Sequence, residues 1–230
     1  MLEISGLRVS YGQSEIIHGL DLTVKRNEKV AVMGRNGMGK TTLFKTLIGI
    51  LESDSGSIKV DGKELAGLPS HARVAAGLAY VPQGRLIFPT LTVMENIQSG
   101  LETTSDRKSV PKEIFELFPV LEEMRSRKGG NLSGGQQQQL AIARALVSNP
   151  KVLLLDEPTE GIQPSIIKEI AQTLNEISRM RDITILVSEQ VLSFTMEIAD
   201  RLFVLESGQL VHEVSREECD PDDISSYLSV

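Results

Sequence analysis

Residues 29–42 read KVAVMGRNGMGKTT, and this stretch decides the fold. Residues 29–33 are typical of a short apolar strand, and residues 34–41 follow it with the spacing Gly-x-x-x-x-Gly-Lys-Thr. Glycines in such a loop let the backbone curl, so that successive N–H groups point inward at phosphate oxygen atoms. Residues 41–50 have the apolar face of a helix, whose positive end near Lys40 favours an anion. The stretch therefore predicts a strand, a phosphate-binding loop and a helix.

The loop offers contacts for the phosphate groups of a nucleoside triphosphate and for its metal ion. We expect the ammonium group of Lys40 to reach the β- and γ-phosphates of ATP, and the Thr41 hydroxyl to bind Mg²⁺. Thr42 would add a further phosphate contact. The residues expected to bind the nucleotide here are Gly34, Arg35, Asn36, Gly37, Met38, Gly39, Lys40, Thr41 and Thr42. The predicted cofactors are ATP and Mg²⁺, but the loop alone does not show what the energy is used for.

The apolar run 152–155 is a second candidate element, because it ends in Asp156 and Glu157. A buried parallel strand is continuously apolar, and ligands bind at the carboxyl ends of such strands. We expect Asp156 to hold Mg²⁺, directly or through water, and Glu157 to polarise the attacking water as the general base. Without the phosphate loop, a core strand ending in solvated acids would be the simpler interpretation.

The composition is that of a globular protein, and 230 residues fit one large domain, with or without an inserted subdomain. A net charge of −7 provides no basic surface, so nucleic acid is not an expected partner. The single cysteine, Cys219, cannot form an internal disulfide and fits a reducing cytosol. We expect no secretory signal, and no apolar stretch approaches the roughly 20 residues that span a bilayer. A role at a membrane would therefore require docking on a separate membrane subunit.

Hydrophobic patterning predicts strands and helices along most of the chain. Residues 2–9 and 16–24 alternate as antiparallel strands do, and residues 57–62 resemble the edge of a hairpin. Further strands are expected at 78–81, 152–155, 183–187 and 202–205, and helices at 165–179 and 192–199. Alternation of this kind predicts a parallel sheet covered by helices.

Residues 88–131 lack strand-like runs and have helical patterning instead. The predicted fold class is α/β, with the mostly parallel sheet of a P-loop NTPase, an N-terminal antiparallel β part and an inserted helical subdomain. The whole chain, 1–230, is then a single domain with a core of residues 1–87 and 132–230. Gln136–Gln139 would form the polar face at the start of a helix.

Residues Leu132–Gln136 read LSGGQ and lie between the phosphate loop and the acidic strand end. This ordered set of motifs resembles the ATP-binding cassette (ABC) ATPases, and the resemblance covers nearly the whole chain. In that family the pentapeptide, called the signature, begins a helix and contacts the γ-phosphate held by a second ATPase subunit. The resemblance implies a RecA-like core, nucleotide contacts from Ser133, Gly134, Gly135 and Gln136, and two ATP molecules sandwiched between two subunits. A hydroxyl, glycine N–H groups and a helix N-terminus suit an anion.

Two further positions match the family, and two depart from it. Gln83 resembles the Q-loop glutamine, which contacts Mg²⁺ and water, and Tyr11 resembles the aromatic residue that stacks on adenine. The D-loop usually reads Ser-Ala-Leu-Asp, but residues 160–164 read EGIQP. The position of the switch histidine holds Gln190, whose amide can hydrogen-bond a phosphate oxygen but carries no charge. We therefore expect Glu157 and Gln190 as the catalytic pair, with an altered γ-phosphate sensor.

Other segments resemble particular branches of the family. Likeness to the ATPases of branched-chain amino-acid importers is found at residues 81–85, 88–89, 91–93 and 189–190. Likeness to the urea-importer branch is found at residues 113–119, 136–139 and 157–164. The main prediction is an ATP hydrolase coupled to transport, the smaller ATPase subunit of a bacterial urea importer. The alternatives are the ATPase of an importer for branched-chain amino acids or short amides, a lipid-extracting or non-transport ABC ATPase, and a nucleotide-binding regulator.

The resemblance also implies partners and a location. The expected partners are a second ABC ATPase subunit, identical or different, transmembrane permease subunits, and a periplasmic solute-binding protein in the full system. The chain would then lie at the cytoplasmic face of the inner membrane as a peripheral protein. An ATPase subunit does not touch the cargo, so its sequence cannot reveal the solute directly.

Overall fold

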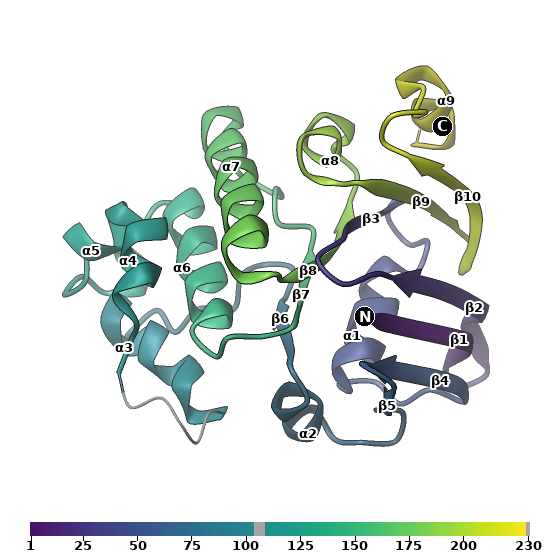
Figure 1. The fold of residues 1–230 in the computed structure, drawn as a ribbon, viewed down its shortest axis with the longest axis horizontal. Coiled ribbons are helices and arrows are strands. Elements are labelled where there is room, and N and C mark those ends of the chain that lie inside the picture. The colour runs from purple at the N-terminus through teal and green to yellow at the C-terminus, as the bar shows by residue number, and fades with distance from the viewer. Residues whose placement is uncertain (104–108, 229–230) are drawn as a thin grey trace.

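The computed structural model describes residues 1–103 and 109–228, and it contains an antiparallel sheet beside a mostly parallel one (Figure 1). The antiparallel sheet has the strand order β2-β1-β4-β5. Its strands are β1 (Leu2–Tyr11), β2 (Ser14–Val24), β4 (Ser55–Val60) and β5 (Lys63–Glu64). Leu2 lies opposite Val24 on one side and Val60 on the other. The antiparallel strands and the hairpin expected from the sequence are therefore confirmed.

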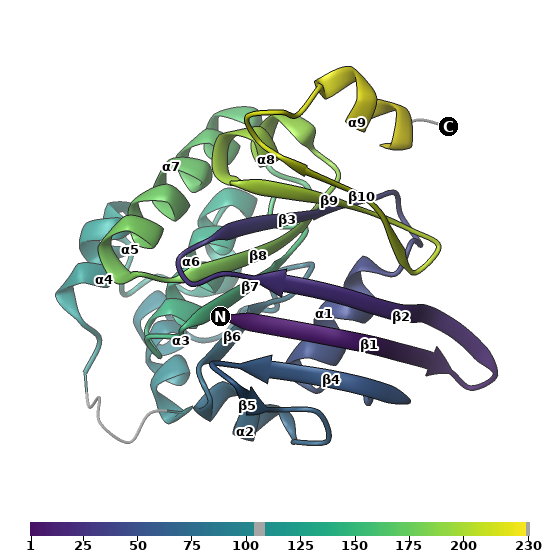
Figure 2. The same cartoon turned by 45° about the vertical axis from the view of Figure 1, so that its right-hand side comes forward.

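The larger sheet has the order β10-β9-β3-β8-β7-β6, and its neighbours run parallel except for β9 and β10 (Figure 2). Its strands are β3 (Lys29–Met33), β6 (Leu78–Val81), β7 (Val152–Asp156), β8 (Thr184–Glu189), β9 (Arg201–Glu206) and β10 (Gln209–Ser215). This architecture confirms the predicted fold class. The sequence analysis missed β10, which follows a tight turn at Ser207 and Gly208 with φ values of 45° and 76°.

Helices cover the parallel sheet on both faces. The helices outside residues 88–146 are α1 (Lys40–Ile48), α2 (Ser70–Ala75), α7 (Pro164–Arg181), α8 (Leu192–Ile198) and α9 (Pro221–Leu228). The sequence predicted α1, α7 and α8 to within a few residues and missed α2 and α9. Arg73 of α2 is only 2% exposed and donates to the carbonyl oxygens of Thr46 and Leu47 at 2.7 and 3.1 Å. It thereby satisfies carbonyl groups at the C-terminus of α1.

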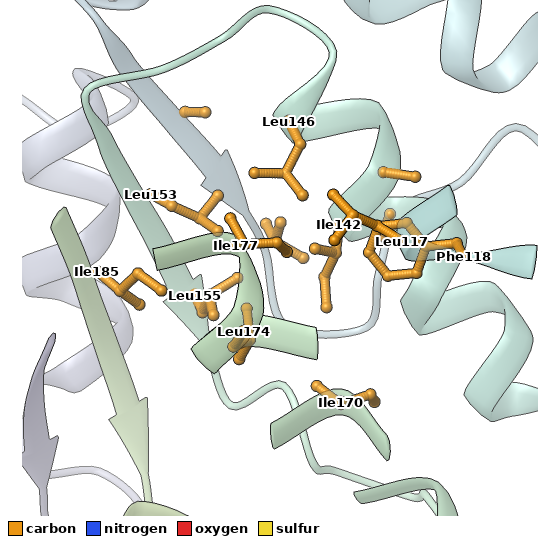
Figure 3. Close-up of a cluster of buried hydrophobic side chains, with 14 of the residues drawn as sticks. Leu117, Phe118, Ile142, Leu146, Leu153, Leu155, Ile170, Leu174, Ile177 and Ile185 are labelled. Atoms are coloured by element: carbon orange, nitrogen blue, oxygen red, sulfur yellow. The ribbon is translucent and has the colours of Figure 1, made fainter. Parts of the chain in front are cut away.

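The alternation of side chains along the parallel strands divides the apolar core between the two faces of the sheet. Val30 and Val32 pack with α1 and the antiparallel sheet, whereas Ala31 and Met33 belong to the cluster on the opposite face. Figure 3 shows part of this second cluster, in which α4, α6 and α7 meet β7 and β8. Its labelled side chains are Leu117, Phe118, Ile142, Leu146, Leu153, Leu155, Ile170, Leu174, Ile177 and Ile185. A strand buried on both faces must be continuously apolar, which explains the run 152–155.

In the described part of residues 88–131, helices and 3₁₀ turns are the regular elements, apart from an isolated bridge between Thr92 and Lys128. This part lies on the side of the parallel sheet away from β1, β2 and β4 (Figure 1). Its elements are α3 (Val93–Ser99), the 3₁₀ turns Gly100–Thr103 and Gly129–Asn131, α4 (Lys112–Leu117) and α5 (Pro119–Glu123), followed by α6 (Gly134–Leu146). Residues 104–108 of the predicted subdomain lie outside the described residues. One interpretation was only partly right: the glutamine run lies at the start of α6, and Gln136 and Gln137 are half-buried. Gln138 and Gln139, however, are only 3% and 8% exposed, because α6 is packed between α3 and α7.

Candidate nucleotide site

The phosphate loop, residues 34–39, joins β3 to α1 and is shaped by its glycines. Gly39 precedes α1 with φ of 104°, a conformation that residues with a side chain rarely adopt. A Cβ atom on Gly34 would lie 2.5 Å from the carbonyl oxygen of Leu205, so the approach of β9 requires glycine there. In the described part of the chain, no side chain caps the N-terminus of α1. Its first N–H groups are therefore available to an anion.

Lys40 is the buried cation of this loop. Its Nζ atom donates to the carbonyl oxygens of Gly34 and Arg35 at 2.6 and 3.0 Å, and it lies 3.0 Å from Oε1 of Glu157. The side chains of Lys40 and Glu157 are only 3% and 8% exposed. Charged hydrogen bonds of this kind satisfy a buried ammonium group. The same ammonium group points into the loop where phosphate oxygens would lie.

Asp156 ends β7, and its carboxylate accepts hydrogen bonds from hydroxyl groups on neighbouring elements. Its Oδ1 atom accepts from Thr41 at 3.3 Å and from Ser188 at 2.6 Å, and its Oδ2 atom accepts from the Tyr80 hydroxyl at 3.1 Å. Burial raises the pKa of Asp156, and these three hydrogen bonds oppose the rise. Burial also raises the pKa of Tyr80, as does the nearby carboxylate of Asp156, so Tyr80 remains a hydrogen-bond donor. The carboxylate is fixed in orientation at the carboxyl edge of the sheet.

Glu157 follows directly and is oriented by three neighbouring side chains. Its φ of 47° is unusual for a residue with a side chain, and its backbone N–H donates to both the carbonyl and the hydroxyl oxygen of Ser188 at 3.1 Å. Gln83 donates to one carboxylate oxygen at 3.2 Å, and Gln190 donates to the other at 3.2 Å. The structure thus brings together Lys40, Gln83, Glu157 and Gln190, as the sequence predicted from separate motifs.

Gln190 also reaches the phosphate loop, because its side-chain amide donates to Oδ1 of Asn36 at 2.8 Å. The residue before it, Glu189, is only 2% exposed and accepts from the backbone N–H of Gln190 at 2.9 Å. Glu189 also accepts from the hydroxyl of Thr159 at 2.6 Å. Burial raises the pKa of Glu189, opposed by these hydrogen bonds. This carboxyl group therefore ties the segment after β8 to the segment after β7.

A cavity of about 260 Å³ lies between these groups. It is lined by Ile16, Asn36, Gly37, Gly39, Lys40, Thr41, Thr42, Gln83 and Glu157. Of the remaining loop residues, Arg35 is exposed and Met38 is half-buried. The cavity is therefore made largely of residues that the sequence assigned to the nucleotide.

The oxygen atoms at this edge suit a magnesium ion. Thr41 and Asp156 offer a hydroxyl and a carboxylate oxygen 3.3 Å apart, and Gln83 lies beside Glu157. Among residues 1–103 and 109–228, no cluster of three or more His, Cys, Asp and Glu side chains could hold a metal. Mg²⁺ usually keeps several waters and binds one or two protein oxygens together with substrate phosphates, so this sparse set fits the expected Mg²⁺.

The signature residues and Tyr11 lie outside this cavity. Ser133 and Gln136 form a reciprocal cap on α6: the backbone N–H of Gln136 donates to the Ser133 hydroxyl at 3.3 Å, and the Gln136 side chain accepts from the Ser133 N–H at 2.9 Å. Neither they nor Gly134 and Gly135 line the cavity. Tyr11, at the end of β1, is 49% exposed and does not line it either.

Sequence analysis missed four polar residues that the site uses: Tyr80, Ser188, Glu189 and Thr159. The first three lie at or near the carboxyl ends of β6 and β8, and Thr159 follows the end of β7. The carboxyl ends of adjacent parallel strands meet at one edge. The strand order would therefore have identified them, but the sequence alone does not give that order.

The fold and this site define a phosphate-loop ATPase with a cassette architecture. A family model described as ABC transporter matches residues 17–160, and the chain belongs to that family. It is an ATP-binding and ATP-hydrolysing subunit of the transporter class.

Several relatives are similar over most of their length. The high-affinity branched-chain amino acid transport ATP-binding protein BraG of Pseudomonas aeruginosa is 42% identical over 213 residues, which cover 92% of this chain and 91% of the relative. The probable branched-chain amino acid transport ATP-binding protein LivF of Archaeoglobus fulgidus is 38% identical, with 91% and 90% covered. The lipopolysaccharide export system ATP-binding protein LptB of Haemophilus influenzae is 34% identical, with 92% and 89% covered.

Solved structures agree with this family. The ADP conformation of MJ1267, an ATP-binding cassette of an ABC transporter, superposes with a TM-score of 0.82 at 28% identity, covering 100% of this chain and 99% of the other. The dimeric structure of MJ0796, a bacterial ABC transporter cassette, gives a TM-score of 0.84 at 25% identity, with 94% and 99% covered.

Replacing Lys40 with alanine should weaken ATP binding. A hydrogen bond to a charged group contributes about 1.5–3 kcal/mol, so the affinity should fall about ten- to hundredfold. Fluorescence titration with a labelled ATP analogue measures this change. Lys63→Ala, an exposed lysine on β5, is the control and should bind ATP normally. Unchanged affinity in Lys40→Ala would contradict the role of the phosphate loop.

Proposed function

We propose that the chain is the ATPase subunit of an importer for branched-chain amino acids. The observation that carries this proposal is the likeness to BraG, 42% identical over 92% of the chain. The cavity lined by the phosphate loop, Gln83 and Glu157 supports it. The urea importer was the main expectation from residues 113–119, 136–139 and 157–164, but the comparisons support the amino-acid alternative better. The ATPase chemistry is the same for both solutes.

In the proposed mechanism, ATP binding releases the general base. Lys40 pairs with Glu157 at 3.0 Å. A triphosphate that takes over the hydrogen bonds of Lys40 would leave the carboxylate of Glu157 free to accept a proton from water. Gln83 and Gln190 each donate to Glu157 and would hold it toward the γ-phosphate. Mg²⁺, held by Thr41, Asp156 and Gln83, would neutralise charge on the phosphates.

The signature would act on a second subunit, identical or different. Ser133 and the glycine N–H groups lie at the N-terminus of α6, away from the chain's own phosphate loop. A helix N-terminus with a hydroxyl group binds phosphate well. The proposed dimer places this anion site against the γ-phosphate held by the partner. Exposed Tyr11 would stack on adenine.

An apolar groove of about 440 Å³ beside the nucleotide site would receive a permease helix. Its lining includes Ile50, Leu86 and Phe88, which are 57%, 68% and 46% exposed. Tyr80 also lines it and donates to Asp156, so the groove and the nucleotide site share a side chain. In the described residues, no helix is long and apolar enough to cross a bilayer. We propose that permeases hold the chain at the cytoplasmic face of the inner membrane.

The full system would include a periplasmic solute-binding protein. Within the chain, we propose that residues 88–131 form a helical subdomain inserted into a core of residues 1–87 and 132–230. Helices α3, α4 and α5 lie in this subdomain, and α6 joins it to the core because α6 contacts both α3 and β6.

Glu157→Gln should retain ATP binding and stop hydrolysis. Glutamine keeps the shape of the side chain but does not act as the general base for water. Turnover of the purified subunit should fall at least about a hundredfold, while a dimer accumulates with ATP in size-exclusion chromatography. Glu176→Gln, exposed on α7, is the control. Turnover within a few-fold of wild type would show that Glu157 is not the base.

Phe88→Asp should weaken docking on the permeases. A charge in an apolar contact is costly when it becomes buried, so the yield of permeases that co-purify with the subunit should drop. Val211→Asp, on β10, is the control, because it introduces the same charge at an apolar residue of matched exposure, 45% against 46%. A complex that stays intact with Phe88→Asp would refute docking in this groove.

Uptake of labelled solutes tests the cargo. A strain that lacks the gene should lose high-affinity uptake of leucine at low external concentration and keep uptake of urea, because the proposed importer recognises branched-chain amino acids. A plasmid copy of the wild-type gene should restore uptake, and a Lys40→Ala copy should not. Loss of urea uptake with normal leucine uptake would contradict this proposal and support the urea importer instead.

A further inference from the structure

Residues 84–86 follow the Q-loop glutamine in an unusual backbone conformation. Gly84, Arg85 and Leu86 have successive φ values of 75°, 70° and 43°. Glycine adopts this left-handed region freely, but arginine and leucine rarely do. Strained residues of this kind persist when their surroundings hold them in place, and they concentrate at functional sites. The contacts of Arg85 show what holds this segment.

The side chain of Arg85 reaches the segment that follows the acidic strand end. Its Nη2 atom donates to the carbonyl oxygen of Glu160 at 2.8 Å. The backbone N–H of Glu160 in turn donates to the carbonyl oxygen of Glu157 at 3.2 Å. The carbonyl oxygen of Arg85 accepts from Nη2 of Arg144, on α6, at 3.3 Å. Arg85 is therefore fixed at both its main chain and its side chain.

The guanidinium group of Arg85 also lies against the first residue of α6. A Cβ atom on Gly134 would be 3.3 and 3.4 Å from its two terminal nitrogens, and one on Gly161 would be 3.6 Å from Nη2. It thus occupies the space between the signature and the D-loop segment 160–161. In residues 1–103 and 109–228, no carboxylate forms an ion pair with Arg85. A cation near a helix N-terminus is disfavoured by the helix dipole, so this placement favours an anion nearby.

We propose that Arg85 is a positioning residue for ATP hydrolysis. Its side chain holds the signature and the D-loop segment in register with Gln83. The segment 83–85 contacts Glu157 through Gln83 and Glu160 through Arg85, so one short loop aligns the general base and the signature helix. This inference rests on the proposed role of the signature in the dimer. Loss of the guanidinium group should misalign the half-site that meets the partner's ATP and leave nucleotide binding to the phosphate loop intact.

Arg85→Gly tests the proposal without adding backbone strain, because glycine accepts φ near 70°. The kcat of ATP hydrolysis should fall about ten- to hundredfold, as expected for the loss of a charged hydrogen bond in the transition state. KM and the ATP affinity of the dilute subunit should stay within about twofold of wild type. Arg85→Lys keeps the charge and should recover part of kcat. Asp182→Gly is the control, another left-handed residue, with φ of 50° after α7, and should hydrolyse ATP normally.

A double variant separates positioning through the signature from a general effect on the fold. If Arg85 acts through the N-terminus of α6, Arg85→Gly should cost less in a Ser133→Ala background than alone. Additive losses, or a fall in ATP affinity as large as the fall in kcat, would overturn the proposal.

Ser133→Arg distinguishes failure of the inference from failure of the proposed function. If Arg85→Gly hydrolyses ATP normally while Ser133→Arg is inactive, the proposed role of Arg85 is wrong and the proposed role of the signature stands. Normal turnover by Ser133→Arg would remove the proposed role of the signature and, with it, the basis of this inference.

Discussion

Lys40 and Glu157 form an ion pair of 3.0 Å that is almost entirely buried, and the rest of the site is arranged around it. A buried charge is costly when it is unpaired, so neither side chain can leave without a replacement. Two backbone carbonyls satisfy the remaining protons of Lys40, and Gln83 and Gln190 satisfy the carboxylate. In the proposed mechanism, a triphosphate replaces Glu157 as the partner of Lys40. Nucleotide binding and release of the proposed base would then be one event.

The parallel sheet makes this pair possible. Strand β8 lies between β3 and β7, so the phosphate loop, the acidic pair and Gln190 emerge at one edge. Alternate side chains of the strands enter different apolar clusters on the two faces, for example Val32 on one and Met33 on the other. Both clusters must form for the sheet to be buried, which gives the loops a rigid support.

The Q-loop segment connects the candidate nucleotide site to surfaces elsewhere on the molecule. Gln83 contacts Glu157, Arg85 contacts Glu160, and Leu86 and Phe88 line the apolar groove. Tyr80, at the end of the same strand, contributes to the groove and to the setting of Asp156. The chain has no contact with cargo in the proposed importer. The ATPase chemistry proposed for this site is therefore independent of the solute.

The sequence by itself determined the phosphate loop, the acidic strand end, the signature and the order of most strands and helices. These features depend on local spacing: glycines that must curl, apolar runs that must be buried, and caps that begin helices. Only the tertiary structure decided that Tyr80 and Ser188 hold Asp156, that Glu189 accepts from Thr159, and that Gln138 and Gln139 are buried. It also decided that Arg85 meets Glu160, 75 residues away along the chain. Such contacts depend on which strands and helices become neighbours, and no local pattern of residues encodes that choice.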